Sequence, residues 1–202
     1  GFDRINVPSV LTTLVTDELD FPNLSMVGVD DRAAAYTAVD YLIRQGHRKI
    51  AVLGGPVTSY PSLMRRQGAQ QAMEDAGIVF NDKLYGLSNY DFESAYHAMN
   101  SLLARRAEFT ALFAMSDVIA FGAIRALVSA GFRVPEDISV IGFDGITMSR
   151  YCVPVMTTIV QPSEQIALQS IELLVRQIEH GSPAQTVTLQ PELQQGESVR
   201  AI

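Results

Sequence analysis

Two apolar segments joined by a helical one constrain most strongly what this chain can fold into. They cover residues 110–115 and 138–143 and are apolar almost throughout, as parallel strands buried on both faces are. Polar groups follow each of them: Ser116 and Asp117 after the first, Asp144 after the second. Because open α/β sheets hold small ligands at the carboxyl ends of parallel strands, this segment predicts a small-molecule site.

Strand-like and helix-like segments alternate along the rest of the chain, which predicts an α/β fold with parallel, doubly wound sheets and right-handed crossovers. Beside the two strands above, we expect strands at 7–11, 25–29, 49–53, 84–87, 157–160 and 185–189. Helical spacing predicts that the helix after Ser116 buries Ala120, Ile124, Leu127 and Val128. The same spacing places Ala167, Ile171, Leu174, Val175 and Ile178 on one apolar face of a helix over 163–180.

Composition narrows the class of protein. The chain has 202 residues, of which 48% are hydrophobic, and no apolar run is long enough to span a bilayer. Its one cysteine, Cys152, forms no disulfide within the chain and fits a reducing compartment, so we expect a cytoplasmic protein. A net charge of −7 predicts that this chain alone does not bind DNA specifically, since affinity for phosphates comes from lysine and arginine.

Several motifs occur together. They are Ala-Met-Ser-Asp-x-x-Ala-x-Gly-Ala-x-Arg-Ala-Leu from residue 114, Val-Pro-Glu-Asp-Ile-Ser-Val-Ile-Gly-Phe-Asp from 134, Gly-His-Arg-Lys-Ile-Ala-Val-Leu-Gly-Gly-Pro from 46, Arg65-x-x-Gly68 and Pro154-x-x-Thr-Thr-Ile-x-Gln161. By these motifs the chain resembles the effector domain of lactose-repressor (LacI/GalR) family transcriptional regulators. The resemblance implies a two-lobe, periplasmic-binding-protein-like (type I) fold with the effector between the lobes.

The resemblance also implies a domain organisation. Residues 1–28 and 163–189 would be a remnant of the N-terminal lobe, and residues 29–162 and 190–202 a complete C-terminal lobe. The family's helix-turn-helix and the opening strands of its N-terminal lobe have no counterpart here, so we expect a chain truncated at its N-terminus. Part of the apolar face of the helix over 164–179 and one sheet edge should then be open to water.

The resemblance assigns the main effector-binding roles to Arg65 and Asp144. An arginine fork suits sugar hydroxyls or a carboxylate, and a carboxylate accepts two neighbouring hydroxyls. The alternatives are a solvated arginine, which fits Arg66 better, and an aspartate that caps a turn. We expect alanine at either position to leave the fold intact. Gly145 stands where family members often have a second acid.

Further candidates are weaker. Tyr90 matches a commonly aromatic position that packs on a sugar ring; its alternative is a loop tyrosine. Ser116 stands where the family usually has Asn or Asp, and it suits ligand binding and helix capping equally, whereas Asp117 favours capping. Gln161 matches the crossover between the lobes, and Thr13 ends the first strand.

No cofactor or metal site is predicted. His47 is expected to be structural, in a turn, and the other two histidines, His97 and His180, to be exposed. None has a spaced partner of the kind a metal needs. Cys152 has no base beside it that would make it a nucleophile.

A homodimer is the expected assembly. The resemblance places its interface near Phe121 and residues 146–153, a predicted loop with Met148, Tyr151 and Cys152. An apolar cluster of this kind in a loop is typical of an interface.

The sequence therefore predicts the ligand-sensing domain of a LacI-type regulator, which binds a sugar or sugar derivative and performs no catalysis. Operator DNA would be a partner only through a helix-turn-helix absent from this chain. The alternative is a periplasmic sugar-binding protein of a transport system, and the upstream sequence would decide between them. An enzyme is disfavoured because residue 146 is Ile, where a phosphatase loop needs a second Asp, and because there is no Gly-x-Ser-x-Gly motif.

Overall fold

The chain forms two compact units in a computed structural model that describes residues 6–17, 19 and 21–202. Residues 1–5, 18 and 20, which belong to the predicted segment 1–28, lie outside the described residues. The smaller unit comprises residues 1–30 and 161–192, and the larger unit residues 31–160 and 193–202.

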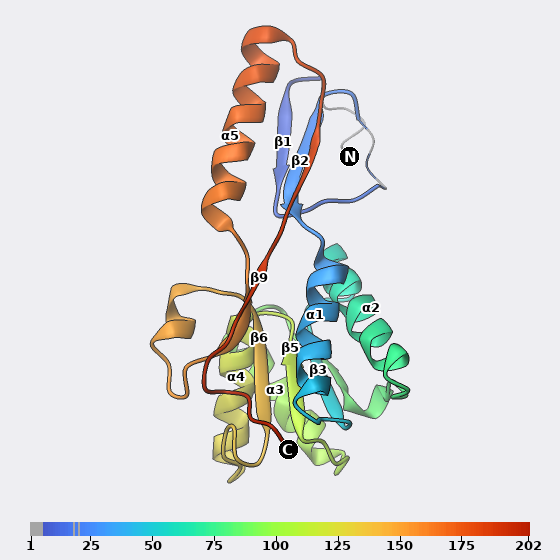
Figure 1. Cartoon of the computed structure of the whole chain (residues 1–202), viewed down its shortest axis with the longest axis vertical. Helices are drawn as coiled ribbons and strands as arrows, with labels where there is room; N and C mark the ends of the chain where they lie inside the picture. The colour runs from blue at the N-terminus through green and yellow to red at the C-terminus, as the bar shows by residue number, and fades with distance from the viewer. Residues whose placement is uncertain (1–5, 18, 20) are drawn as a thin grey trace. The chain divides into compact units, whose positions relative to one another are not determined.

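The smaller unit is a three-stranded parallel sheet covered by one long helix (Figure 1). Its strands lie in the order β1 (Ser9–Thr12), β2 (Leu24–Val29) and β8 (Thr186–Leu189). Helix α5 (Ser163–His180) packs against β1 and β2 and ends at a left-handed Gly181, with φ of 62°. The small core consists of Val27, Val29, Ile166 and Leu173.

The sheet does not cover the predicted apolar face of α5. The sheet covers a different stripe, made of Ile166, Ser170, Leu173 and Gln177. Its polar members have partners there: the Ser25 hydroxyl donates to Gln177 Oε1 at 3.1 Å, and the Ser170 hydroxyl to the Ile166 carbonyl. The expectation that part of the apolar face is open to water is confirmed, because Ile171, Val175 and Ile178 are exposed.

The larger unit is a six-stranded sheet between two pairs of helices (Figure 1). The strand order is β4 (Tyr85–Leu87), β3 (Ile50–Gly54), β5 (Ala111–Ala114), β6 (Ser139–Asp144), β7 (Thr157–Val160) and β9 (Glu192–Gln194). The pairings from β4 to β7 are all parallel. One helix pair is α1 (Asp31–Arg44) with α2 (Tyr60–Asp75), and the other is α3 (Phe92–Ala104) with α4 (Asp117–Ser129).

The predicted strands and helices agree with these bounds to within a few residues, and they confirm the α/β class with parallel sheets. Strand β9 was not predicted, since it is short and polar. Two short 3-10 helices, η2 (Asp82–Leu84) and η3 (Thr147–Arg150), lie in segments expected to be loops or strand starts. Val128 is 52% exposed, so its predicted burial is wrong, while Ala120 and Leu127 are buried as predicted.

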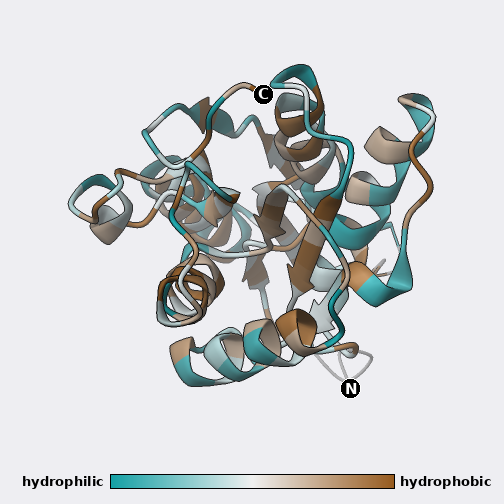
Figure 2. Ribbon diagram, turned by 90° about the horizontal axis from the view of Figure 1, so that it is seen from below, coloured by the Kyte–Doolittle hydropathy of each residue, from teal (hydrophilic) through white to brown (hydrophobic). Residues whose placement is uncertain are grey.

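The sheet of the larger unit carries the main core. Its strands are hydrophobic and run between the two helix pairs (Figure 2). Close helix contacts depend on glycine: a Cβ on Gly68 of α2 would lie 2.0 Å from the Arg32 carbonyl oxygen of α1. Gly122 has the same function between α4 and α3, where a Cβ would lie 2.5 Å from the Phe92 carbonyl oxygen.

Within the described residues, no helix is both long enough and apolar enough to cross a membrane.

Candidate ligand-binding site

Arg65 is buried in the larger unit rather than solvated, with 5% of its surface exposed. Gly68 lies one helical turn further along α2 and lets α2 approach α1, which brings Arg65 against the first turn of α1. There Arg65 Nε donates to Asp31 Oδ1 at 2.7 Å. The motif Arg65-x-x-Gly68 thus has a structural basis: the glycine permits the contact that the arginine makes.

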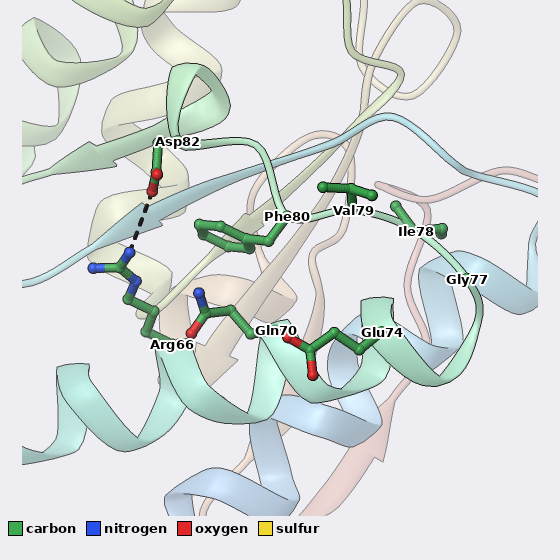
Figure 3. A pocket seen from close by; sticks show the side chains of 8 residues that line it. All are labelled: Arg66, Gln70, Glu74, Gly77, Ile78, Val79, Phe80 and Asp82. Carbon is green, nitrogen blue, oxygen red and sulfur yellow. Dashed lines mark hydrogen bonds and ion pairs between the residues drawn. The ribbon is translucent and has the colours of Figure 1, made fainter.

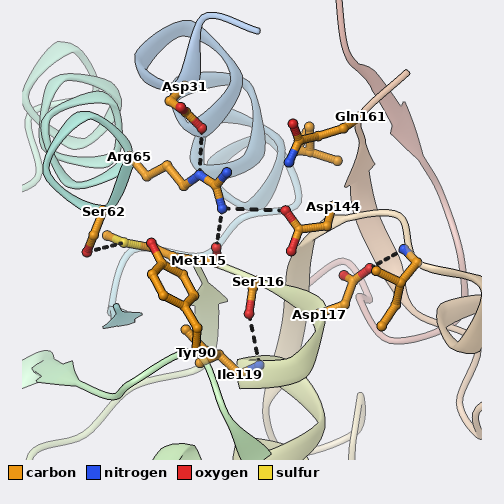
Figure 4. Close-up of polar contacts among 12 residues, drawn as sticks. Asp31, Ser62, Arg65, Tyr90, Met115, Ser116, Asp117, Ile119, Asp144 and Gln161 are labelled. Atoms are coloured by element: carbon orange, nitrogen blue, oxygen red, sulfur yellow. Dashed lines mark hydrogen bonds and ion pairs between the residues drawn. The ribbon is translucent and has the colours of Figure 1, made fainter. Parts of the chain in front are cut away.

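The Arg65 guanidinium contacts three segments besides α2 (Figure 4). Its Nη1 group donates to the Met115 carbonyl at 2.5 Å, just after β5, and lies 3.6 Å from Asp144 Oδ1 at the end of β6. Its Cζ atom lies 3.7 Å from the centre of the Phe143 ring, within cation–π distance. These contacts direct the guanidinium toward the carboxyl ends of β5 and β6.

Asp144 lies at the end of β6 in a conformation unusual for a residue with a side chain. Its φ is 110°, and Gly145 follows with φ of 70°. A Cβ on Gly145 would lie 2.7 Å from Val160, so glycine is required there on steric grounds as well. The Asp144 side chain is 26% exposed, which leaves the carboxylate accessible from solvent beside the Arg65 cation.

Tyr90 lies over the end of β3. Its ring rests on Gly55, where a Cβ would come within 2.1 Å of the ring carbons. The Tyr90 hydroxyl lies 3.4 Å from the Ser59 hydroxyl, which is itself the N-cap of α2. Tyr90 has φ of 60°. It is half-buried, and Figure 4 shows it near Ser116 and Met115 in the larger unit.

Ser116 caps α4. Its hydroxyl oxygen accepts a hydrogen bond from the Ile119 amide at 3.1 Å, and only 3% of its surface is exposed. The cap uses an oxygen lone pair and leaves the O–H group as a donor, so capping and ligand contact are compatible.

Asp117 does not cap α4, so that prediction is wrong. Its carboxylate is fully buried, accepts from Thr158 Oγ1 at 2.6 Å and from the Ile146 amide at 2.9 Å, and thereby connects β7 to the segment after β6. Burial raises the pKa of this carboxyl to about 6 against the two hydrogen bonds, and the nearby Asp144 adds to the rise. Asp31, in the first turn of α1, also makes a tertiary contact, since it binds Arg65.

Backbone strain coincides with the predicted site residues. Among the described residues, four that are not glycine have positive φ: Thr13, Tyr90, Arg106 and Asp144. Three of these are candidate effector-binding residues, and Thr13, with φ of 63°, is β-branched, which makes the conformation costlier still. Strained residues persist where the surrounding structure holds them, commonly at functional sites.

The larger unit brings together Arg65, Tyr90, Ser116 and Asp144 at the carboxyl ends of β3, β5 and β6. The other two candidates belong to the smaller unit. Thr13 follows β1, and its amide donates to the Val27 carbonyl at 2.8 Å; Gln161 follows β7 and begins that unit's second segment.

The remaining predicted residues lie elsewhere. Met148 and Tyr151 are 58% and 76% exposed, while Phe121 and Cys152 are half-buried. His47 is buried in its turn, with Nδ1 2.9 Å from Thr110 Oγ1, which agrees with a structural role. Among the described residues, no group of three or more His, Cys, Asp and Glu side chains could hold a metal ion.

A separate cavity of about 510 Å³ lies between α2 and the loop 77–82 (Figure 3). Its arginine, Arg66, is not simply solvated: it pairs with Asp82 at 3.3 Å and stacks on Tyr85 at 4.4 Å. These contacts occupy the guanidinium within the fold, so Arg66 offers less to a ligand than Arg65.

Known proteins are similar to this chain in sequence and in fold. Residues 39–199 match the family model described as a periplasmic binding protein-like domain. The chain is 37% identical over 199 residues to the HTH-type transcriptional regulator MalR of Clostridium butyricum, covering 98% of this chain and 59% of that protein. It therefore spans a little over half the length of that relative.

Two solved structures are also similar. The transcriptional regulator CelR–cellobiose complex has a TM-score of 0.84 and 33% identity, covering 89% of this chain and 56% of that one. A LacI family transcriptional regulator from Enterococcus faecium with bound ribose has a TM-score of 0.81 and 28% identity, covering 89% of this chain and 66% of that one. The chain belongs to the periplasmic binding protein-like family, in the form found in the effector domains of LacI-family transcriptional regulators.

Because Arg65 is buried, we expect its removal to lower the stability of the fold, contrary to the expectation from the sequence. Arg65→Ala leaves the buried Asp31 carboxylate without its cation, so we expect a loss of about 3–5 kcal/mol in the free energy of unfolding. Asp144→Ala removes a partly exposed group at a longer distance and should cost less than about 1 kcal/mol. Urea unfolding measures both. Removing Asp31 as well should restore part of the Arg65→Ala loss; equal losses in the two single variants would contradict this arrangement.

The raised pKa of Asp117 predicts a pH dependence of stability. Between about pH 4 and pH 6 the folded protein holds a proton on this carboxyl that the unfolded chain has lost. Its contribution to stability therefore falls as pH rises through this range, by about 3 kcal/mol for a shift of this size. Asp117→Asn has no such proton. The unfolding free energy of the wild type minus that of the variant should decline from pH 4 to pH 6. Parallel stability–pH profiles of the two proteins would refute the raised pKa of Asp117.

Proposed function

We propose that this chain is the ligand-sensing domain of a LacI-type transcriptional regulator and that the carboxyl ends of β3, β5 and β6 bind its effector. The observation that carries the proposal is the orientation of Arg65. Asp31 accepts from its Nε–H group and the Met115 carbonyl from its Nη1 group, and these contacts hold the guanidinium beside Asp144 at the carboxyl ends of β5 and β6. A cation held in this way loses little side-chain entropy on binding.

The surrounding groups suit a sugar or sugar derivative. Asp144 supplies carboxylate oxygens that accept from neighbouring hydroxyls, and Ser116 supplies a hydroxyl. The half-buried Tyr90 ring offers an apolar face for C–H groups. The structures of similar regulators with cellobiose and with ribose support this class of ligand. Thr13 and Gln161, carried by the smaller unit, remain candidates for further contacts.

Regulation would be a coupling between ligand and DNA. The named relative is an HTH-type regulator longer than this chain, which supports a DNA-binding domain outside these 202 residues. Effector binding would then change the affinity of a dimer for operator DNA by an equilibrium coupling between two sites. A homodimer in the cytoplasm is part of this proposal, with Phe121, Met148, Tyr151 and Cys152 at its interface.

The relatives favour this function over the alternatives. They are named as transcriptional regulators, which supports a sensor rather than a transport protein or an enzyme.

A thermal-shift screen with monosaccharides, disaccharides, sugar phosphates and purines should find a sugar that raises the melting temperature. In calorimetry with that sugar, Asp144→Ala and Tyr90→Leu should each weaken binding, the former by about ten- to a hundred-fold through loss of a charged hydrogen bond. Asp137→Asn is the control, since it removes a carboxylate that pairs with the exposed Arg133. Unchanged affinity in the Asp144 variant would rule out this site.

The proposed interface predicts a change of assembly. Tyr151 and Met148 are exposed apolar side chains in the segment after β6, and a charge on either should be costly once a partner covers it. The double variant Met148→Asp, Tyr151→Asp should shift a dimer to monomer in sedimentation velocity. Val79→Asp is the control, because Val79 is also an exposed apolar residue, at 87%, but lies on another loop. An unaltered dimer in the double variant would place the interface elsewhere.

A further inference from the structure

A buried carboxylate lies between two strands of the larger unit, outside the proposed ligand contacts. The Asp117 side chain accepts from Thr158 Oγ1 on β7 at 2.6 Å and from the Ile146 amide after β6 at 2.9 Å. The chain makes room for it at Gly142, where a Cβ would lie 2.2 Å from Asp117 Oδ1. The carboxylate therefore fits into a gap on β6 that only glycine leaves open.

The Ile146 amide lies where a turn ends and a short 3-10 helix begins. Asp144 and Gly145, directly before it, form a turn with φ of 110° and 70°. Ile146 itself is the N-cap residue of η3 and makes no side-chain capping bond. One hydrogen bond to Asp117 thus fixes both the end of the turn that presents Asp144 and the beginning of the exposed apolar segment 146–153.

Helix capping does not account for this side chain, because Ser116 caps α4. Stability does not account for it either, since a fully buried charge is costly unless it is well paired. A carboxylate differs from a neutral side chain of the same shape in that both its oxygens accept hydrogen bonds. An asparagine can keep both contacts, because the Thr158 hydroxyl accepts as well as donates, but its neutral oxygen binds the Ile146 amide less strongly than a carboxylate oxygen does.

We propose that Asp117 is a positioning residue whose carboxylate holds the turn 144–146 against β7 and so joins the candidate ligand group Asp144 to the apolar segment 146–153. A ligand that binds Asp144 contacts the turn 144–146. The last residue of this turn, Ile146, directly precedes η3. The inference builds on the proposed function only for the ligand; the mechanical link needs no ligand and can be tested without one.

The ligand-free test compares Asp117→Asn with the wild type by hydrogen–deuterium exchange at pH 7. Peptides covering 144–153 should exchange faster by about five-fold, because the Ile146 amide then has a neutral acceptor in place of a charged one. The melting temperature should stay the same or rise, because a buried charge has gone. Asp137→Asn, a carboxylate-to-amide change at an ion pair after α4, should leave these peptides unchanged.

Cys152 gives a second readout. It is the one cysteine of the chain and lies half-buried within the segment, where its thiol donates to the Ser149 and Pro154 carbonyls at 3.3 and 3.1 Å. At a concentration where all three proteins have the same oligomeric state, its alkylation by iodoacetamide should be faster in Asp117→Asn than in the wild type, and unchanged in Asp137→Asn. Thr158→Val, which removes the other contact of the carboxylate, should loosen the segment less than Asp117→Asn.

Two outcomes overturn the inference. Exchange and alkylation that match the wild type would show that Asp117 does not hold the segment. Faster exchange throughout the larger unit together with a lower melting temperature would show a merely structural role. With cellobiose or ribose as probe, a sugar that protects 146–153 in the wild type should fail to do so in Asp117→Asn. If no sugar of the thermal-shift screen binds the wild type, the proposed ligand class fails, while the ligand-free comparison still decides the role of Asp117.

Discussion

The larger unit depends on the placement of one cation in its interior. The Arg65 guanidinium meets Asp31 at the start of α1, the Met115 carbonyl after β5 and Asp144 at the end of β6. A charge without such partners would be expelled from a protein interior, so helix, strand ends and carboxylates must converge for the fold to keep it. The same convergence gathers polar groups at one edge of the sheet, where a ligand can use them. Stability and recognition thus arise from one arrangement of charges.

The order of strands and helices could be predicted from sequence because this part of the information is local. Buried parallel strands are continuous apolar runs, as at Thr157–Val160, and helices show apolar residues at helical spacing, as at Ser163–His180. Turns with Gly or Pro separate these segments. The buried face of α5 could not be predicted, because that helix carries two apolar stripes and periodicity does not say which one the sheet covers. The structure covers the stripe with Ser170 and Gln177, whose polar groups find partners.

Much of the candidate site was also within reach of the sequence, since Arg65, Tyr90, Ser116 and Asp144 follow strands or their connections. The residues that contact them could not be predicted from the sequence. Asp31 and Asp117 look like helix caps in the sequence, and only tertiary structure shows that one binds Arg65 and the other Thr158. The glycines gave an unused signal: Gly68 and Gly142 stand where a neighbouring group approaches too closely for any Cβ.

The capping role of Ser116 bears on how such a domain can change its ligand over evolution. The position needs only a side-chain oxygen that accepts from the Ile119 amide, and Ser, Thr, Asn and Asp all meet that need. Each would present a different set of donors and acceptors to the site. Asp144 and Tyr90, with their positive φ, are far less free to vary. New specificities should therefore be reached most readily through residue 116, where the chemistry can be exchanged while helix α4 still begins in the same place.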